Sequence, residues 1–467
     1  MLGFDTIGNA TAICYDVEPI VVTDPWIAGD AYFGSWAAPF EIPADQLDAI
    51  SRAQYVWLSH GHPDHTNSAS LDLLSGKTIL LPDHVGGRMA HDLRQLGFTV
   101  RVMPDREWMQ LSRNIKAMCV SDYNQDAILL IDVGGRLLLD VNDAVERGWG
   151  RFVKNIVSGY RESFLLKLFG YGDADMINIF REDGSRLLPP APDSSAEARQ
   201  FWDGYLQEKM RFWVRYFGTT HMIPFSMFHV YQRADSAWAE AYRTPTEVIE
   251  EAKFDGCEVL PSFIRFDCET GILTPLRPKP LPAGLRDPKE FGDDWSEPLD
   301  AGESEAVGRY FRSIDFLRDH LDYVRVRVGG KEKTIELRPK PVAGRGVTFE
   351  VPRGSLMNAV QYACFDDLLI GNFMKTTIHG NWGTALAPNV LYPHFTPWVT
   401  RYADNGGAKT RQQLDEYFMA YRKRAPFDHI FHRFEHEGAQ KLRTLMQPGS
   451  VLFRVATRTY SMLKRIR

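Results

Sequence analysis

The chain has 467 residues, 44% of them hydrophobic, which is enough for the cores of two or three globular domains. Its formal net charge of −6 argues against nucleic acid as a partner. Five scattered cysteines, with no Cys-x-x-Cys and no Cys-x-His pair, exclude a disulfide framework, a zinc ribbon and a Rieske cluster. Because no leader-like or membrane-spanning apolar run occurs, we expect a cytoplasmic protein without a transmembrane segment.

The N-terminal part alternates short β-type runs with turns, and one run ends in Asp24-Pro25-Trp26. Aromatic residues follow in the segment 30–36, where they either line a pocket or pack over a sheet. We expect a helix over 43–53, a strand over 55–60 and a helix over 68–76. Strand and helix alternate again to residue 103, which predicts an α/β sandwich.

Two β-runs, 127–133 and 136–142, are joined by Gly134-Gly135, a strong hairpin signal. From 150 to 215 the composition is helical and aromatic and includes the run SFLLKLFGYG at 163–172. A β-run over 221–231 and a helix in 244–256 follow. This part therefore adds a hairpin and several helices to the sandwich.

The segment 273–295 contains five prolines and many charges, and we place the domain boundary there. We predict a first domain over 1–265 and a C-terminal α+β domain over 285–467 that shapes the substrate site. In the second domain, β-runs flank Gly329-Gly330 as in a hairpin, and 351–363 favours a helix.

The segment WLSHGHPDHTN places four potential metal ligands within six residues, directly after a β-run: His60, His62, Asp64 and His65. We expect His60 and His62 to face one metal ion, and Asp64 and His65 to face an adjacent one. Imidazoles and a carboxylate suit zinc, iron or manganese without selecting among them. The alternative is a polar turn whose histidines bond to one another. We predict a metalloenzyme with two divalent metal ions.

HGHPDH matches the H-x-H-x-D-H signature of the metallo-β-lactamase superfamily. VVTDPWI resembles the strand ending in Asp-Pro-Trp of its branch related to N-acyl-phosphatidylethanolamine phospholipase D. The resemblance implies a four-layered αββα sandwich, an α/β fold, over about residues 1 to 265. It also implies a third histidine for the first metal, a bridging aspartate, and a final histidine for the second metal.

RLLLDVNDA resembles the family's strand ending in Gly-Asp, which implies that Asp143 is the bridging carboxylate and that Asn142 replaces the glycine. Asp140 competes for this role. At the position of the third histidine stands Asp122, which is either a ligand or a turn residue, and Asp126 is a weaker candidate.

The final ligand falls in MIPFSMFH, where Ser226 takes the usual histidine position. His229, three residues further on, is our choice for this ligand, and His221 is the second choice. Either histidine could instead belong to the core.

A carboxylate in place of an imidazole makes the site harder and favours higher-valent iron. In this exchange the chain also resembles the di-iron β-hydroxylases of antibiotic biosynthesis, which belong to the same superfamily. The segments LLLDVNDA, IPFSMF and FDDLLIGNF (365–373) also resemble CMP-N-acetylneuraminate hydroxylase. This implies oxygen-dependent, di-iron hydroxylation of a small polar, sugar-nucleotide-like substrate. Since that family's Rieske ligands are not found here, we expect an external reductase as electron donor.

A hydrolase is the competing class. In a zinc enzyme of this kind, a metal-bridging hydroxide attacks a phosphodiester, amide or lactone. In either class we expect Asp64 and Asp143 to be the catalytic carboxylates. A third hypothesis is a degenerate metal-binding scaffold. We favour the oxygenase over the hydrolase, while the substrate and the oligomeric state cannot be derived from the sequence.

Overall fold

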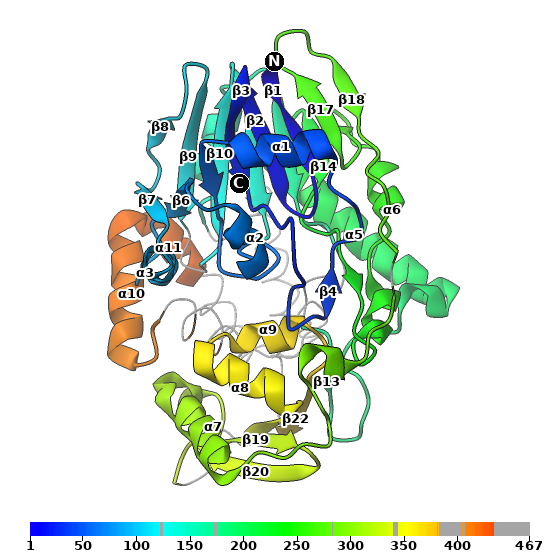
Figure 1. Cartoon of the computed structure of the whole chain (residues 1–467), viewed down its shortest axis with the longest axis vertical. Coiled ribbons are helices and arrows are strands. Elements are labelled where there is room, and N and C mark those ends of the chain that lie inside the picture. Colours follow the sequence, from blue (N-terminus) through cyan, green and yellow to red (C-terminus); the bar gives the residue numbers. More distant parts are fainter. Residues whose placement is uncertain are drawn as a thin grey trace, which may run out of the picture.

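The structure is a computed structural model that describes residues 1–121, 125–146, 148–170, 176–282, 284–339, 344–380, 382, 399, 404 and 407–433, without the side chains of 431–433. Figure 1 shows two halves: stacked sheets with helices on them in the upper half, and a smaller group of helices and strands below. The early, blue part of the chain belongs to the upper half.

Within the described residues, the first sheet has eight strands in the order β18 (Leu273–Pro275), β17 (Ile264–Asp267), β1 (Leu2–Ile7), β2 (Thr11–Asp16), β3 (Glu18–Thr23), β5 (Tyr55–Trp57), β6 (Thr78–Pro82) and β7 (Thr99–Met103). From β3 to β7 the neighbours are parallel, and parallel neighbours need crossover connections. The helices α1 (Ala44–Arg52), α2 (Ser68–Leu73) and α3 (Arg88–Gln95) lie in these three connections, as predicted.

The second sheet has seven strands in the described part, in the order β16 (Glu258–Val259), β14 (His221–Pro224), β12 (Ser163–Lys167), β11 (Arg136–Asn142), β10 (Ala127–Val133), β9 (Ile115–Ser121) and β8 (Trp108–Gln110). The predicted hairpin joins β10 to β11. Gly134 and Gly135 in its turn have φ values of 59° and 87°. A two-residue turn of type I′ has positive φ at both central positions, which glycine adopts without steric penalty, so the hairpin prediction is confirmed.

The helical prediction for 163–172 is wrong in its first half, because 163–167 form β12. This strand runs parallel to both β11 and β14, and all five of its residues are buried. A strand covered on both faces has no polar alternate positions, so its sequence lacks the alternation that identifies a half-exposed strand. The helices of this part are α4 (Gly150–Val157) and α5 (Ala196–Phe217), which lie on either side of β12 in the sequence.

The two sheets pack face to face, with β1 and β2 against β10 and β6 against β9. Buried apolar side chains from both sheets fill the space between them, among them Phe4 and Cys14 from the first sheet and Leu129 and Phe164 from the second. The helices lie outside, α1 to α3 on the first sheet and α4 and α5 on the second. Figure 1 shows α1 lying across the face of the sheets. The predicted four-layered αββα sandwich of metallo-β-lactamase type is therefore confirmed.

The C-terminal region, by which we mean residues 285 onward, is an α+β unit. A third sheet has five described strands: β13 (Ile179–Phe180), β22 (Lys375–Gly380), β21 (Arg345–Glu350), β19 (Tyr323–Val328) and β20 (Lys331–Glu336). The helices of this region are α7 (Ala301–Ser313), α8 (Arg353–Tyr362), α9 (Phe365–Ile370), α10 (Arg411–Arg424) and α11 (Pro426–Arg433). The predicted hairpin joins β19 to β20. Since β13 comes from the first half of the sequence, the domain limits at 265 and 285 stay a prediction.

The short elements of the described part include β4 (Trp36–Ala37), its antiparallel partner β15 (Val230–Tyr231), and α6 (Thr246–Glu250). None of the helices in the described part of the chain combines the length and the apolar character that crossing a membrane requires.

The C-terminal region packs against the sandwich through polar contacts on both sides of α9. Arg88, at the start of α3, donates hydrogen bonds to three backbone carbonyl oxygens of this region, those of Tyr362, Ala363 and Asp404. Ser35 Oγ donates to the carbonyl oxygen of Gly371 at 2.6 Å. Figure 1 shows α9 lying between the sandwich and α8.

Candidate metal centre

The loop from β5 to α2 carries the predicted cluster. β5 lies between β3 and β6 in the parallel part of the first sheet, and the loop leaves it at the carboxyl end of the strand. All four side chains are buried: His60, His62, Asp64 and His65. Asn67 ends the loop as the N-cap of α2, where its side chain accepts hydrogen bonds from two backbone N–H groups of the first turn. The loop is thus held between a buried strand and a capped helix.

Asp143 brings a carboxylate from the second sheet to this loop. The preceding residue, Asn142, has a φ of 49°, a left-handed conformation that asparagine tolerates better than most residues. Asp143 Oδ2 lies 3.3 Å from His65 Nε2 and 3.7 Å from His60 Nε2. One ligand atom from each of these three residues lies within 4.8 Å of the other two, so they form a group that could hold a metal ion. Asp140, the competing carboxylate, is not in this group.

His60 and His65 each turn one ring nitrogen to the cluster and the other to a partner in the sandwich. His60 Nδ1 lies 2.9 Å from Ser59 Oγ, while its Nε2 lies 2.8 Å from His62 Nδ1. His65 Nδ1 lies 3.1 Å from an oxygen of Asp24, while its Nε2 lies 3.2 Å from Asp64 Oδ2. Partners of this kind set the tautomer and the ring orientation of metal-binding histidines.

His62 follows the same pattern, but its partner comes from the C-terminal region. Its Nδ1 faces His60, and its Nε2 lies 3.1 Å from Oδ2 of Asp366 in α9. Both side chains are buried. In the sequence, Asp366 lies in the hydroxylase-like stretch 365–373, and no role was predicted for it.

Asp24, which follows β3, ties together several parts of the cluster. Its carboxylate accepts hydrogen bonds from the Ser59 N–H at 2.8 Å, from Ser59 Oγ at 2.7 Å and from Asn142 Nδ2 at 2.7 Å. It also faces His65. The Asp-Pro-Trp motif was the signal that could have assigned it this supporting role.

Both oxygens of Asp64 accept hydrogen bonds. The Tyr32 hydroxyl donates to Oδ1 at 2.5 Å, and Asn9 Nδ2 donates to Oδ2 at 2.9 Å. Tyr32 is buried, so it supports the cluster and does not line an open pocket. Asn9 lies in the turn between β1 and β2, and no signal in the sequence identified it.

Ser226, at the position where the resemblance implies a histidine, lies in the cluster. Its hydroxyl donates to Asp143 Oδ1 at 2.6 Å and lies 3.4 Å from His65 Nε2. The side chain therefore orients the carboxylate that is predicted to bridge the metals.

His229, the predicted final ligand, is buried and stacks on Trp36 with ring centroids 3.5 Å apart. Neither of its ring nitrogens has a hydrogen-bond partner among the described residues. Burial, together with nearby Arg243, lowers its pKa to about 3, so the ring is neutral. It is not in the group formed by His60, His65 and Asp143, and its role as a ligand stays a prediction.

The remaining candidates lie apart from this group or outside the described residues. His221, at the start of β14, bonds to Thr220 Oγ1 at 2.9 Å and stacks on Phe164. Asp126 is buried, and its backbone carbonyl oxygen accepts a hydrogen bond from His84. Asp122 falls in 122–124, outside the described residues, so its predicted role as a ligand stays a prediction.

The ionisable groups of the cluster favour the binding of cations. Burial raises the pKa of the Asp143 carboxyl, but the neighbouring His65 and His60 outweigh burial and hold that pKa well below its usual range. Burial lowers the pKa of His65, but Asp64 and Asp143 outweigh it and raise that pKa well above its usual range. The carboxylates are thus ionised and hold a proton on the imidazole between them. Divalent ions replace such protons when they bind, so the donor set fits metal ions.

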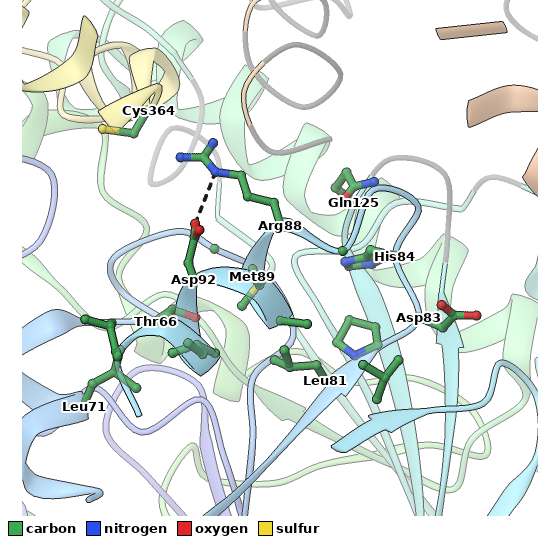
Figure 2. A pocket seen from close by; sticks show the side chains of 17 residues that line it. Thr66, Leu71, Leu81, Asp83, His84, Arg88, Met89, Asp92, Gln125 and Cys364 are labelled. Carbon is green, nitrogen blue, oxygen red and sulfur yellow. Dashed lines mark ion pairs between the residues drawn. The ribbon is translucent and has the colours of Figure 1, made fainter. Parts of the chain in front are cut away.

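A cavity of about 230 Å³ lies beside the metal loop, where the sandwich meets the C-terminal region. Its wall includes Thr66 of the loop, Arg88 and Asp92 of α3, and Cys364 just before α9. Figure 2 shows the Arg88 side chain, paired with Asp92, reaching toward Cys364. The volume is below the roughly 300–1,000 Å³ of typical ligand pockets, so we assign no substrate to this cavity alone.

No family model matches the chain, but curated relatives do. The chain is 32% identical over 153 residues to cytidine monophosphate-N-acetylneuraminic acid hydroxylase of Asterias rubens, covering 30% of this chain and 23% of the relative. The gorilla protein of the same name is 28% identical over 153 residues, covering 30% and 26%. The chain thus spans about a quarter of the length of these relatives. The expected relationship to these hydroxylases is confirmed over this segment.

Solved structures with a similar fold include enzymes of different reaction classes. CmlA, a diiron beta-hydroxylase from Streptomyces venezuelae, is 15% identical with a TM-score of 0.38, covering 56% of this chain and 53% of that one. Igni18, a metallo hydrolase from Ignicoccus hospitalis, is 12% identical with a TM-score of 0.33, covering 59% and 98%. Likenesses at these levels carry no argument about the reaction. The fold assignment rests on the strand order and the layers described above.

Proposed function

We propose that the chain is a binuclear metal-dependent enzyme, namely a non-heme di-iron hydroxylase that uses molecular oxygen. The observation that carries the proposal is the donor set. Three buried imidazoles share one cluster with the buried carboxylate of Asp64 and the partly buried carboxylate of Asp143. Ser226 stands where the resemblance implies a further imidazole. A site that is poorer in nitrogen and richer in carboxylate suits iron better than an all-nitrogen site would.

In this proposal His60 and His62 face the first metal ion, Asp64 and His65 face the second, and Asp143 faces both. The further ligands in this proposal are Asp122, which stands at the position of the pattern's third histidine, and His229, which lies three residues past the position of its final histidine. When bound, two iron ions would supply the redox chemistry that dioxygen requires.

The residues around the ligands keep the donors in place. Ser59 and Asp24 orient His60 and His65, while the hydroxyls of Tyr32 and Ser226 hold the carboxylates of Asp64 and Asp143. Side chains held in this way need little reorganisation, so the reorganisation free energy is small when charge changes at the site.

The overall reaction determines what else the enzyme needs. Hydroxylation breaks a C–H bond, inserts one oxygen atom of dioxygen, and reduces the other oxygen atom to water with two electrons and two protons. The sequence contains no Cys-x-His pair that could hold a Rieske cluster. We therefore include an external reductase in the proposal.

The substrate class comes from the curated relatives, whose names specify hydroxylation of cytidine monophosphate-N-acetylneuraminic acid. We carry over a small, polar, sugar-nucleotide-like substrate. It would bind where the C-terminal region, through Asp366, meets the metal loop.

Metal analysis of protein purified from its native host, together with an optical spectrum, tests this function. We expect about two iron ions per chain and the near-ultraviolet absorption of a di-iron centre. With a reductant, isotopically labelled dioxygen and CMP-N-acetylneuraminate as the probe, one labelled oxygen atom should enter the sugar nucleotide. Two zinc ions in a colourless protein would contradict the hydroxylase.

A hydrolase is the second candidate, and one observation favours it. The neutral ring of His229, a ligand in either proposal, has no hydrogen-bond partner on either nitrogen among the described residues. If it makes up for the imidazole that is replaced at Ser226, the second metal position is no poorer in nitrogen than the pattern implies. A site with more nitrogen suits zinc, whose Lewis acidity would activate water for attack on a phosphodiester, amide or lactone. If zinc is found, hydrolysis of such model substrates becomes the next assay.

A further inference from the structure

Each of the three imidazoles of the cluster has a partner at the ring nitrogen that faces away from the cluster, and these partners come from different regions of the chain. Ser59 and Asp24, behind His60 and His65, belong to the sandwich. Asp366, behind His62, belongs to α9 of the C-terminal region. The orientation of one of the three imidazoles thus depends on a part of the chain outside the sandwich.

The geometry at His62 distinguishes its two ring nitrogens. Nδ1 lies 2.8 Å from His60 Nε2 on the cluster side, whereas Nε2 lies 3.1 Å from Asp366 Oδ2. A neutral imidazole carries one N–H donor and one nitrogen lone pair. A carboxylate at Nε2 keeps the proton on that nitrogen, which leaves the lone pair of Nδ1 for the cluster.

Contacts with the sandwich lie on both sides of α9. Before the helix, Arg88 donates to the carbonyl oxygens of Tyr362 and Ala363. After the helix, Ser35 Oγ donates to the carbonyl oxygen of Gly371 at 2.6 Å. The position of Asp366 relative to His62 is therefore maintained by the contact between the two regions.

We propose that Asp366 is a positioning residue of the metal centre, which holds His62 in the tautomer and orientation that metal binding requires. It follows that the site reaches full metal affinity only when α9 is docked on the sandwich. The inference rests on the proposed function only in requiring that the cluster binds metal, and it holds for iron and zinc alike.

The test measures the affinity of the full chain for Zn²⁺ and Co²⁺ alone, by competition with a chelator. Removal of a partner of this kind typically weakens metal binding 10–100-fold, and we expect a loss of that size for Asp366→Ala. Asp366→Asn keeps an oxygen that can accept the Nε2 proton, so it should recover most of the affinity. The Co²⁺ spectrum of Asp366→Ala should also change, because the His62 ring is no longer held.

Asp404→Asn is the matched control. Asp404 is a buried carboxylate of the same region that accepts hydrogen bonds from Tyr310 and from the backbone N–H of Phe365, next to Asp366. Asparagine keeps an oxygen that can accept both hydrogen bonds and leaves α9 docked, so the proposal predicts wild-type affinity for this variant. A general effect of removing a buried negative charge from this region should instead lower the metal affinity here too.

Two results would overturn the proposal: wild-type affinity in Asp366→Ala, or an equal loss in Asp404→Asn. A wild-type protein that binds neither metal would instead remove the proposed function, and this inference with it. Binding of two metals by the wild type, with no effect of Asp366→Ala, would leave the proposed function standing.

Discussion

His65 and His62 are three positions apart in one loop, yet they depend on different regions of the molecule. The partner of His65, Asp24, is 41 positions away and follows a strand of the same sheet. The partner of His62, Asp366, is 304 positions away and reaches the loop from the C-terminal region. The comparison indicates that folding of the sandwich forms one part of the site, while docking of a second region completes it.

The largest effect is expected from His60→Ala, because His60 contacts both His62 and Asp143. Removing a residue that faces the metal should cost more than the 10–100-fold that is typical of a supporting partner. Metal content after equilibrium dialysis should fall from two ions per chain to below one. His221→Ala, the control, should keep both ions, and a loss there would make His221 the final ligand in place of His229.

Asp24→Ala and Asp366→Ala should differ in how much they lower the free energy of unfolding. Asp24 supports the site from within the sandwich, whereas Asp366 supports it from the C-terminal region. Asp24→Ala leaves buried donors of Ser59 and Asn142 without their acceptor, which should destabilise the metal-free protein by about 3 kcal/mol and also weaken metal binding. Asp366→Ala should weaken metal binding with a smaller loss of stability. Urea unfolding in the presence of a chelator measures both variants, and equal losses would mean that α9 belongs to the same folding unit as the sandwich.

Arg88→Ala tests whether the docking of α9 on the sandwich affects metal affinity when no ligand or ligand partner is changed. Arg88 contacts none of the predicted ligands, but it anchors the chain before α9. Loss of these charged hydrogen bonds, worth about 1.5–3 kcal/mol each when fully formed, should allow α9 to move and weaken metal binding severalfold. Arg94→Ala, an exposed change on the same helix, should leave the affinity unchanged. Unchanged affinity in Arg88→Ala would show that Ser35 and packing are sufficient.

The smallest effect on metal binding is expected at His84, a histidine held by a carbonyl oxygen and not by a carboxylate. The change expected there is in the pH dependence of stability. Burial, with a contribution from Arg424, lowers its pKa to about 4. Below its ordinary pKa of about 6.5 the unfolded chain binds a proton that the native ring does not, so stability falls as the pH drops from about 6.5 to about 4. His84→Gln should remove about 2 kcal/mol of this dependence. Chemical unfolding of the metal-free variant across that range measures it, and an unchanged slope would assign the effect to other groups.

The loop cluster was the part of the site most accessible to prediction. Its four ligand candidates span six residues after an apolar strand, so local geometry alone brings them together. Asp143 was predicted from the resemblance of RLLLDVNDA to a family strand that ends in Gly-Asp. The position of Asp366 beside His62 could not be predicted in this way, because it depends on the packing of two regions across 304 positions.

In the fold, too, the elements determined by local sequence were predictable, whereas those determined by their surroundings were not. Strands that alternate or meet at glycine pairs were predicted correctly, as in β10 and β11 or β19 and β20. β12 was mistaken for a helix because both of its faces are covered, and a wholly apolar run does not reveal its period. Tyr32 was left between two roles, since only the three-dimensional structure shows that its hydroxyl reaches Asp64.

The hydrogen bond from Asn142 to Asp24 crosses from the second sheet to the first. Asp143 therefore approaches from one sheet and His65 from the other. The distance of 3.3 Å between His65 Nε2 and Asp143 Oδ2 depends on how the two sheets are aligned. A substitution deep between the sheets, for example at Phe164, could slide one sheet over the other and change this spacing without touching a ligand. We therefore expect substitutions in the apolar interior to change which metal ion the site prefers, and a search for such variants can begin there.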